Sequence, residues 1–483
     1  MPSMNAPLRT APTFEIVDLA LFERDVRLRM PFRFGIVTLT AAPQAFVRAR
    51  IRLSDGREVE GASAELLAPK WFDKNPALSN EDNFEQLRTA IRLASRAYQQ
   101  GQAATAFGHF EAHHLSHIDR AKAAGLNTLT ANFGPALIDR ALVDALCRAE
   151  QLSFYTAMRH NLGGLHATTL APDLADFDFP AFLAGLNPDT TIQARHTVGL
   201  VDLISVGDRP AGVEAVNDGL PETLEEVVKR YGHRWFKLKV GGNLRDDIER
   251  LAAIAQVLDR MPHPYQASLD GNEQYDDVDS ITALWSAMKT DPRLSRLVAS
   301  IVFIEQPIKR ANALSRDIRA LAQQAPVIID ESDDTLDAFV RARALGYTGV
   351  SSKTCKGIWR SIINAARCSL WNAQPGKPGN FFMSAEDLTI QAGLALQQDL
   401  ALVNLLGISH VERNGHHYVN GMSDLPPEEQ ARFLQSHADL YEYSHGATRV
   451  AIRAGSLSIE SLNCVGFASA AMPEWSAMRR LTD

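Results

Sequence analysis

The chain has 483 residues, which exceeds the usual size of one hydrophobic core, so we expect two domains or one barrel with an accessory layer. Apolar residues make up 46% of the chain and charged residues 22%, a composition typical of globular proteins and unlike that of disordered ones. The formal net charge is -8 and no long basic run is present, so we expect no nucleic-acid partner.

Neither the cysteines nor the N-terminus indicates secretion or membrane insertion. The cysteines are scattered without CxxC spacing, which favours reduced thiols over a disulfide framework or a zinc knuckle. The first residues lack the apolar stretch of a secretory signal, and no window approaches the roughly 18 apolar residues of a membrane span. We therefore expect a cytoplasmic protein without membrane association.

The first third of the chain changes from strand patterning to helix patterning. Residues 14–66 alternate apolar and polar positions around the turn SDGREVEG, which is typical of hairpins. From about residue 80 to 160 the apolar spacing becomes helical. We predict an α+β domain over residues 1–165, followed by a connector rich in Pro and Asp.

The next region alternates short apolar runs with amphipathic helical stretches, the pattern of a parallel sheet covered by helices. This pattern predicts a (β/α)₈ barrel over residues 185–425, of class α/β. We expect residues 426–483 to pack back on the N-terminal domain and complete it. The eight predicted strands are TIQARHTVGL, RWFKLKV, YQASLDG, SIVFIEQP, PVIIDES, GVSSKTC, NFFMSAE and ISHVERN.

Charged side chains stand at the ends of the second to sixth predicted strands, where barrel enzymes carry their chemistry. These residues are Lys237, Lys239, Asp270, Asn272, Glu305, Asp330, Glu331 and Lys353. Carboxylates on adjacent strand ends repel each other and are costly to bury, which calls for a shared cation. Oxygen ligands without nearby cysteine favour Mg²⁺ over zinc.

Asp270, Glu305 and Asp330 are the predicted metal ligands. Alternation along a strand directs Glu331 away from Asp330, toward an outer position or a helix cap. Each acid alone could equally cap a helix or pair with a lysine. Three acids on successive strands favour the metal site.

The lysines are candidates for acid/base chemistry. Lys237 and Lys239 lie two residues apart, so an extended strand places both ammonium groups on one face. Two adjacent cations near a metal favour loss of a proton from each other, which makes a lysine a usable base. Lys353 lies across the barrel from this pair, although a salt bridge with Asp330 or Asp270 is an alternative role, and we place nearby Lys356 in a loop.

The segments WFKLKVGG, SLDGNEQY, VFIEQPI, VIIDES and SSKTCKG, in this order, resemble the enolase superfamily, and within its mandelate racemase/muconate lactonizing enzyme family they are most similar to the muconate-lactonizing branch. The N-terminal hairpins and helices resemble the capping domain of that family. The resemblance implies Asp270, Glu305 and Asp330 as ligands of one Mg²⁺, with Mn²⁺ as an alternative. It also implies Lys239 and Lys353 as acid/base groups on opposite substrate faces, with Lys237 as electrostatic support.

The implied reaction is removal of the proton beside a carboxylate, because bound metal offsets the charge of the resulting enediolate. Epimerisation or racemisation, cycloisomerisation, or β-elimination can follow. The partner is then a small-molecule carboxylate, and we expect a homo-oligomer. Three alternatives remain: an acid-sugar dehydratase of the same superfamily, an inactive metal-binding relative that serves as a binding protein, and an unrelated phosphate-sugar isomerase barrel.

The ends of the seventh and eighth predicted strands match the family less closely. The polar residues there could face the pocket and select the substrate, and a helix cap or a surface ion pair is an equally good interpretation for each; they are Glu386, Asp387, Glu412, Arg413, His416 and His417. His416 and His417 form a poor chelating pair, because neighbours on a strand point to opposite faces. The substrate-contact candidates are Asn272, Glu331, Glu386, Asp387 and Glu412, together with Phe32 and Arg33 in a predicted hairpin loop.

Overall fold

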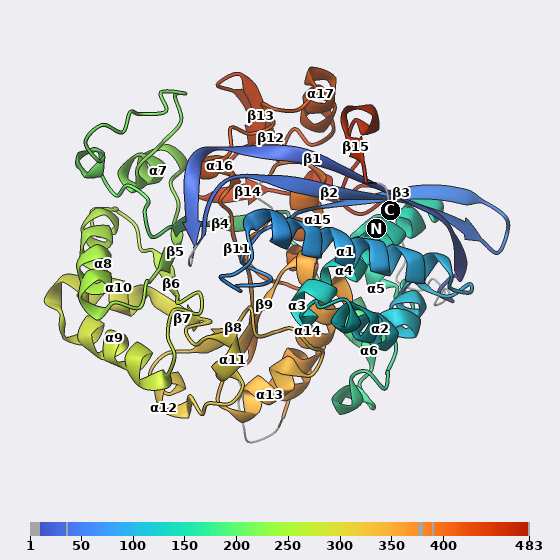
Figure 1. The fold of residues 1–483 in the computed structure, drawn as a ribbon, viewed down its shortest axis with the longest axis horizontal. Helices are drawn as coiled ribbons and strands as arrows, with labels where there is room; N and C mark the ends of the chain where they lie inside the picture. Colours follow the sequence, from blue (N-terminus) through green and yellow to red (C-terminus); the bar gives the residue numbers. More distant parts are fainter. Residues whose placement is uncertain (1–9, 35–36, 375–379, 389–390, 482–483) are drawn as a thin grey trace.

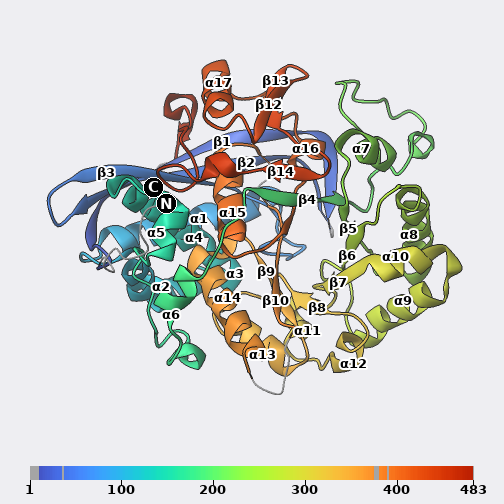
Figure 2. The ribbon, with the colours of Figure 1, turned by 180° about the vertical axis from the view of Figure 1, so that it is seen from behind.

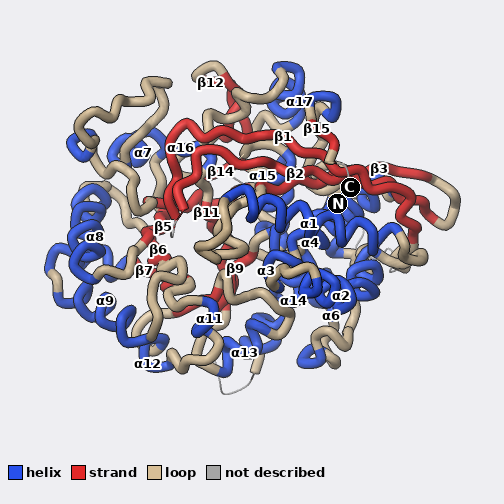
Figure 3. Tube along the Cα trace, in the orientation of Figure 1, coloured by secondary structure: helices blue, strands red, loops and turns tan. Residues whose placement is uncertain are grey.

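The computed structural model describes residues 10–34, 37–374, 380–388 and 391–481. Within these ranges, eight parallel strands close into a barrel, because the last strand pairs in parallel with the first. Figure 3 shows the strands inside a ring of helices. The predicted (β/α)₈ barrel is confirmed. Its strands are β4 (Thr191–Val198), β5 (Trp235–Lys239), β6 (Gln266–Asp270), β7 (Ile301–Glu305), β8 (Val327–Ile329), β9 (Gly349–Ser352), β10 (Phe382–Ala385) and β11 (His410–Glu412).

The barrel strands are buried on both faces, as expected for parallel strands with helices outside. The helices between them begin at ordinary caps: in α7, Thr223 and Glu226 form a capping box, and Gly232 ends the helix in the left-handed conformation. Figure 1 shows α8, α9, α12 and α13 around the outside. The helices are α7 (Leu224–Tyr231), α8 (Leu244–Leu258), α9 (Val278–Thr290), α10 (Ser295–Ser300), α11 (Arg310–Ala313), α12 (Arg319–Ala322), α13 (Ala338–Ala344), α14 (Ile358–Asn372), α15 (Leu394–Leu405) and α16 (Gly415–Tyr418).

The N-terminal domain is an antiparallel sheet packed against helices, as predicted. Its three long strands are joined in sequence order, and α4 lies between this sheet and α1 with nearly every residue buried. The elements are β1 (Phe14–Phe34), β2 (Val37–Leu53), β3 (Glu58–Leu66), α1 (Asn80–Gln99), α2 (Ala106–Ala123), α3 (Thr128–Ala131), α4 (Phe133–Ala149), α5 (Phe154–Arg159) and, in the connector, α6 (Phe179–Ala184).

The C-terminal segment joins both parts of the molecule. β14 pairs antiparallel with β4 of the barrel, and β15 pairs antiparallel with β1 of the N-terminal sheet. Figure 2 shows this segment beside the N-terminal sheet. The expectation that it completes the capping domain is therefore confirmed. Its elements are α17 (Pro427–Ser436), β12 (Tyr441–Ser444), β13 (Ala447–Val450), β14 (Ser456–Ser458) and β15 (Arg479–Arg480).

Two expectations from composition can be compared with the structure. Cys147, Cys355, Cys368 and Cys464 form no disulfide. Among the described residues, no helix combines the length and the apolar character that crossing a bilayer requires.

Gly61 sets the distance between β3 and α4. A Cβ atom at this position would collide with the backbone of Ala141 and Ala145 in α4. We expect Gly61→Ala to lower the free energy of unfolding by about 1–3 kcal/mol, the usual cost of overpacking. Urea denaturation followed by circular dichroism measures this change. Gly185→Ala is the matched control, because a Cβ there meets only ordinary contacts, and equal stability of the two variants would contradict the prediction.

His437 is a buried histidine in the C-terminal segment, with both ring nitrogens beside hydrogen-bond partners. Its buried ring accepts a hydrogen bond from the Ala470 N–H at Nε2 and lies 3.0 Å from Ser461 Oγ at Nδ1. Burial lowers the pKa of His437 to about 4. The unfolded chain, with its ordinary histidine pKa, therefore binds more protons than the folded chain between about pH 6.5 and 4, and stability falls as the pH falls through this window.

Acidification from pH 7.5 to 5 should therefore destabilise the wild type more than His437→Gln. Glutamine can both donate and accept in place of the two ring nitrogens but takes up no proton. Between pH 7.5 and 5, the free energy of unfolding of the wild type should fall by about 1–2 kcal/mol more than that of His437→Gln. One proton of difference between the folded and unfolded states contributes about 1.4 kcal/mol per pH unit. Urea titrations at the two pH values measure it, and parallel losses in both proteins would refute the assignment.

Candidate active site

One buried ammonium group lies at the centre of the strand ends. Lys237 Nζ is 2.9 Å from Asp270 Oδ2, 2.8 Å from Glu305 Oε1, 2.7 Å from Glu386 Oε2 and 3.0 Å from Glu412 Oε2. The four carboxylates come from β6, β7 and the ends of β10 and β11, so side chains from around the barrel converge on one cation. Glu386 and Glu412, for which a helix cap or surface ion pair was an equal alternative, are buried here instead.

The other two lysines each pair with a different aspartate. Lys239 Nζ lies 2.5 Å from Asp270 Oδ2, and Lys353 Nζ lies 2.7 Å from Asp330 Oδ2. Because β5 and β9 are the second and sixth of the eight strands, the two ammonium groups approach the centre from opposite sides of the barrel. The salt bridge between Lys353 and Asp330, predicted as an alternative role for Lys353, is present.

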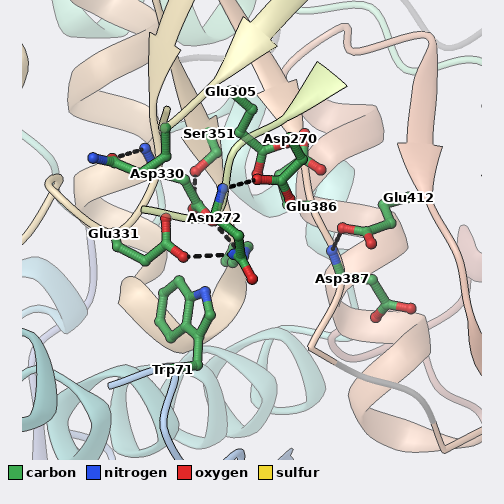
Figure 4. A network of polar contacts seen from close by, with 12 residues as sticks. Trp71, Asp270, Asn272, Glu305, Asp330, Glu331, Ser351, Glu386, Asp387 and Glu412 are labelled. Carbon is green, nitrogen blue, oxygen red and sulfur yellow. Dashed lines mark hydrogen bonds and ion pairs between the residues drawn. The ribbon is translucent and has the colours of Figure 1, made fainter. Parts of the chain in front are cut away.

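Trp71 of the N-terminal domain covers this end of the barrel. Its ring centre lies 4.3 Å from Lys353 Nζ, a cation–π distance, and the side chain is buried. The loop that carries it is fixed to the barrel, since Arg310 donates hydrogen bonds to the carbonyl oxygens of Trp71 and Phe72. Figure 4 shows Trp71 facing the cluster formed by Asp330, Glu331 and Asn272.

Asp330 and Glu331 make separate contacts, in line with the alternation expected along the strand. Asp330 accepts hydrogen bonds from Lys353 and from the Ser351 hydroxyl. Glu331 Oε1 accepts a hydrogen bond of 2.8 Å from Asn272 Nδ2, whose backbone N–H donates to Asp270 Oδ1. Glu331 thus lies beside the three predicted ligands and is linked to Asp270 through Asn272 (Figure 4).

Burial and neighbouring charges shift the ionisation of these groups. Burial, reinforced by Asp270 and Glu386, raises the pKa of Glu305 well above its usual range. Burial also raises the pKa of Glu331 to about 7. Asp330 behaves in the opposite way: burial disfavours its charge, but Lys353 and Lys356 outweigh that cost and lower its pKa.

Lys237 differs from the expectation that an adjacent cation lowers its pKa. Burial alone would lower the pKa of Lys237, but the four carboxylates outweigh it and raise the pKa well above the ordinary value. The pKa of Lys353 is also raised, because Asp330 outweighs the effect of burial. The sequence pattern predicted the neighbouring lysine but not the number of acids that surround the pair.

The residues at this end of the barrel fit a hard divalent cation. Asp270, Glu305 and Asp330 offer only oxygen atoms, and among the described residues Glu305 Oε2, Glu331 Oε2 and Asn272 Oδ1 are buried without a hydrogen-bond donor. Glu305 Oε2 does lie 2.8 Å from Lys237 Nζ. Burial raises the pKa of Glu305, and the neighbouring carboxylates of Asp270 and Glu386 reinforce that rise. An added cation with oxygen preference would offset both effects.

Of the remaining predicted substrate contacts, Asp387 adjoins this cluster, because its backbone N–H donates to Glu412 Oε2 at 3.1 Å. Asp387 pairs with Arg413, with 3.0 Å between Oδ1 and Nη1, and accepts a hydrogen bond from the Asn414 N–H. Phe32 is buried against Tyr418, with ring centres 4.3 Å apart. Arg33 is exposed at the end of β1. A role of these residues in substrate binding stays a prediction.

One local prediction near the site was wrong: His416 and His417 lie in helix α16 and not on a strand, and both are buried. Lys356 lies in the connection between β9 and α14, where it is buried in a short 3₁₀ helix. Its Nζ donates to the Ser351 carbonyl oxygen at 2.8 Å and lies 3.2 Å from Asp333 Oδ2. In both cases the chain turns into a helix directly after a barrel strand, which the short apolar runs did not reveal.

The structure also adds residues that the sequence reasoning missed. Arg195 on β4 bonds Glu386, and Thr197 on the same strand donates to Glu412 at 2.5 Å. A charged residue inside an apolar strand was a usable signal for Arg195. Lys74 donates to the Asn272 carbonyl oxygen and lies 2.6 Å from Glu273 Oε2. Lys74 and Trp71 sit in an irregular loop, where no spacing rule points to them.

Comparison with known proteins supports the same fold. Residues 219–428 match the family model described as "Enolase C-terminal domain-like". No functionally curated protein matches the chain. The family match covers most of the barrel.

Solved structures of similar fold span nearly the whole chain. A muconate lactonizing enzyme from Pseudomonas fluorescens, complexed with muconolactone, has a TM-score of 0.57 and 18% identity over 96% of this chain and 98% of that one. An isomerase from Streptomyces coelicolor A3(2) has a TM-score of 0.58 and 15% identity, covering 95% and 97%. An enolase from Bradyrhizobium, complexed with magnesium and mandelic acid, has a TM-score of 0.56 and 15% identity, covering 92% and 96%. At these identities the likeness establishes the barrel with its capping domain.

Replacing Glu305 by glutamine should separate cation binding from folding. Because burial disfavours the charged form of Glu305 and raises its pKa, the neutral isostere should leave the stability of the metal-free protein nearly unchanged. It should weaken Mg²⁺ binding by at least about tenfold, since a charged ligand is lost. Thermal shift and calorimetric titration with MgCl₂ measure both effects.

Glu249→Gln serves as the control, because Glu249 is an exposed acid that pairs with Arg293 on the barrel exterior. Equal stabilisation of Glu305→Gln and Glu249→Gln by Mg²⁺ would show that Glu305 is no ligand.

Proposed function

We propose that this chain is an enzyme of the mandelate racemase/muconate lactonizing enzyme type that removes the α-proton of a small-molecule carboxylate and forms an enediolate. The observation that carries the proposal is the placement of Lys239 and Lys353 on opposite sides of a barrel mouth that also holds Asp270, Glu305 and Asp330. Two amine side chains flanking a cluster of acids suit proton removal at one carbon and return at either face. A cation held by Asp330 would offset the carboxylate charge that raises the pKa of Lys353, and would thereby make this lysine a better base. Epimerisation or racemisation, cycloisomerisation and β-elimination are all compatible outcomes.

Lys239 and Lys353 are the proposed acid/base pair. The ammonium group of each lysine pairs with an aspartate. This pairing keeps both side chains directed toward the centre of the barrel mouth. Trp71 restricts Lys353 further by covering it with a flat apolar surface. Lys237 is enclosed by four carboxylates and is less available to a substrate; its proposed role is electrostatic.

Asp270, Glu305 and Asp330 would hold one Mg²⁺, with Mn²⁺ as an alternative. The bound ion would supply charge stabilisation for the two oxygens of the enediolate. Asn272 and Glu331 would orient Asp270 through the hydrogen bonds they form beside it. The oxygens of Glu331 and Asn272 that accept no hydrogen bond support this assignment among the described residues.

The loop that carries Trp71 and Lys74 would exclude water from the site of proton removal. Trp71 and Lys74 extend from the N-terminal domain onto the strand ends, where Lys74 contacts Asn272 and Glu273. A dry site strengthens the electrostatic interactions that favour proton removal. We place the chain in the muconate-lactonizing branch because of the lysine pair on β5 and the lysine after β9, and we expect a cytoplasmic homo-oligomer.

Proton exchange in deuterated water tests the proposal. With Mg²⁺ present, a panel of acid sugars, dipeptides, N-acylamino acids and lactones is followed by NMR for loss of the α-proton signal. We expect Lys239→Ala and Lys353→Ala to slow exchange by about 10²-fold or more, the usual contribution of a positioned acid or base. For a chiral substrate, each variant should affect mainly the enantiomer whose α-proton faces the missing lysine.

Lys289→Ala is the matched control, because Lys289 extends from α9 on the barrel exterior, where it bonds Gln324. Undiminished exchange in both Lys239→Ala and Lys353→Ala would rule out this pair as the acid and base. A protein that binds Mg²⁺ but exchanges no α-proton across the panel would instead act as a binding protein.

A further inference from the structure

Three buried histidines meet on the outer side of the barrel wall, away from the carboxylate cluster. His196 lies on β4 between Arg195 and Thr197, whose side chains contact Glu386 and Glu412 inside the barrel. Alternation along the strand therefore directs His196 outward. His233 precedes β5 and His416 lies in α16, so three separate segments bring their rings together.

The hydrogen bonds leave ring nitrogens available as metal ligands. His233 Nδ1 lies 2.9 Å from the Ala194 carbonyl oxygen and must carry the proton to donate to it. Its Nε2 then has a free lone pair, and this atom is buried without a hydrogen-bond partner among the described residues. The His416 nitrogen that faces this group is Nε2, which lies next to His196 Nδ1. A histidine fixed by a backbone carbonyl at one nitrogen is the usual form of a metal-ligating histidine.

The spacing of the rings suits tetrahedral coordination. One nitrogen from each of the three rings lies within 4.8 Å of the others, and His196 Nδ1 is 3.1 Å from His416 Nε2. The ring centres are 5.0 to 5.3 Å apart in all three pairs. Three imidazoles bound to one ion at about 2.0–2.1 Å place their nitrogens roughly 3.3 Å apart and their ring centres about 5 Å apart. Small movements of the side chains would bring the nitrogens from the first arrangement to the second.

The charge state of the rings is also suitable. Burial and the mutual proximity of the histidines lower the pKa of His196 and of His416 well below the ordinary value, and burial lowers that of His233 to about 4. The rings are therefore neutral at physiological pH, the form in which histidine binds metals. The nearby cation Arg29 is balanced, since its guanidinium pairs with both carboxylate oxygens of Asp218.

We propose that His196, His233 and His416 bind one transition-metal ion of the zinc class. Three neutral nitrogen ligands favour such an ion over Mg²⁺, which prefers oxygen. The fourth position is left to water or another small ligand. The ion would join β4, the segment before β5 and α16, and would therefore brace the barrel wall behind Lys237 and Glu412.

His417 provides a matched control within the same cluster. It is buried, and its ring centre lies 5.2 Å from that of His196, but it is not one of the three residues whose nitrogens converge. Burial lowers the pKa of His417 to about 3, so it too is neutral. Substituting it perturbs the packing of the same region without removing a proposed ligand.

The test uses Co²⁺ alone as a spectroscopic probe on the full chain. The protein is stripped with a chelator, supplied with excess MgCl₂ to occupy the carboxylate cluster, and titrated with Co²⁺. Tetrahedral Co²⁺ with nitrogen ligands absorbs visible light far more strongly than octahedral Co²⁺ with oxygen ligands, so the spectrum identifies the site. We expect about one strongly absorbing Co²⁺ per chain, displaced by Zn²⁺.

His233→Gln and His196→Gln should each weaken this binding by at least about tenfold, whereas His417→Gln should leave it unchanged. Circular dichroism checks that each variant folds, and Glu305→Gln should retain the Co²⁺ spectrum because its lesion lies inside the barrel. Absence of the tetrahedral spectrum in the wild type would overturn the proposal. So would undiminished binding in His233→Gln and His196→Gln, or an equal loss in His417→Gln, since the rings would then form only a neutral hydrogen-bonded cluster.

Discussion

The ammonium group of Lys237 is the interaction on which the barrel mouth depends. It neutralises part of the repulsion among Asp270, Glu305, Glu386 and Glu412, all of which are buried at the ends of different strands. Removing one partner from a buried ionic cluster leaves uncompensated charge, which is far more costly than losing a surface pair. The same lysine therefore holds strand ends from both halves of the barrel in place before any substrate arrives.

The capping domain depends on this arrangement and also completes it. Arg310 fixes the loop of Trp71 and Phe72, and Lys74 reaches Glu273 at the end of β6. The C-terminal segment connects the two domains by adding β14 to the barrel and β15 to the N-terminal sheet. Segments near both ends of the chain thus hold the capping domain over the ends of the barrel strands, which come from the middle of the chain. A substrate would therefore contact groups from both domains.

Periodicity in the sequence predicted the local structure, whereas contacts between distant segments could not be predicted from it. Apolar runs predicted every barrel strand, and alternation placed Lys237 and Lys239 on one face, where both reach Asp270. Neither rule could show that Glu386 and Glu412 would surround Lys237, because that depends on how the barrel closes. Trp71 lies in an irregular loop, and its contact with Lys353 joins residues far apart in sequence that no pattern connects.

Strand β4 separates two kinds of ligand chemistry within one wall. Thr197 points inward and bonds Glu412, while His196 points outward toward His233 and His416. Oxygen ligands thus gather inside the barrel and nitrogen ligands outside it. The two clusters would therefore select ions of different ligand preference. Because the two side chains are neighbours on one rigid strand, a shift of the histidine cluster would also move Thr197, and through it the carboxylate that contacts Lys237. The histidine cluster and the carboxylate cluster are therefore connected through two adjacent residues of β4, His196 and Thr197.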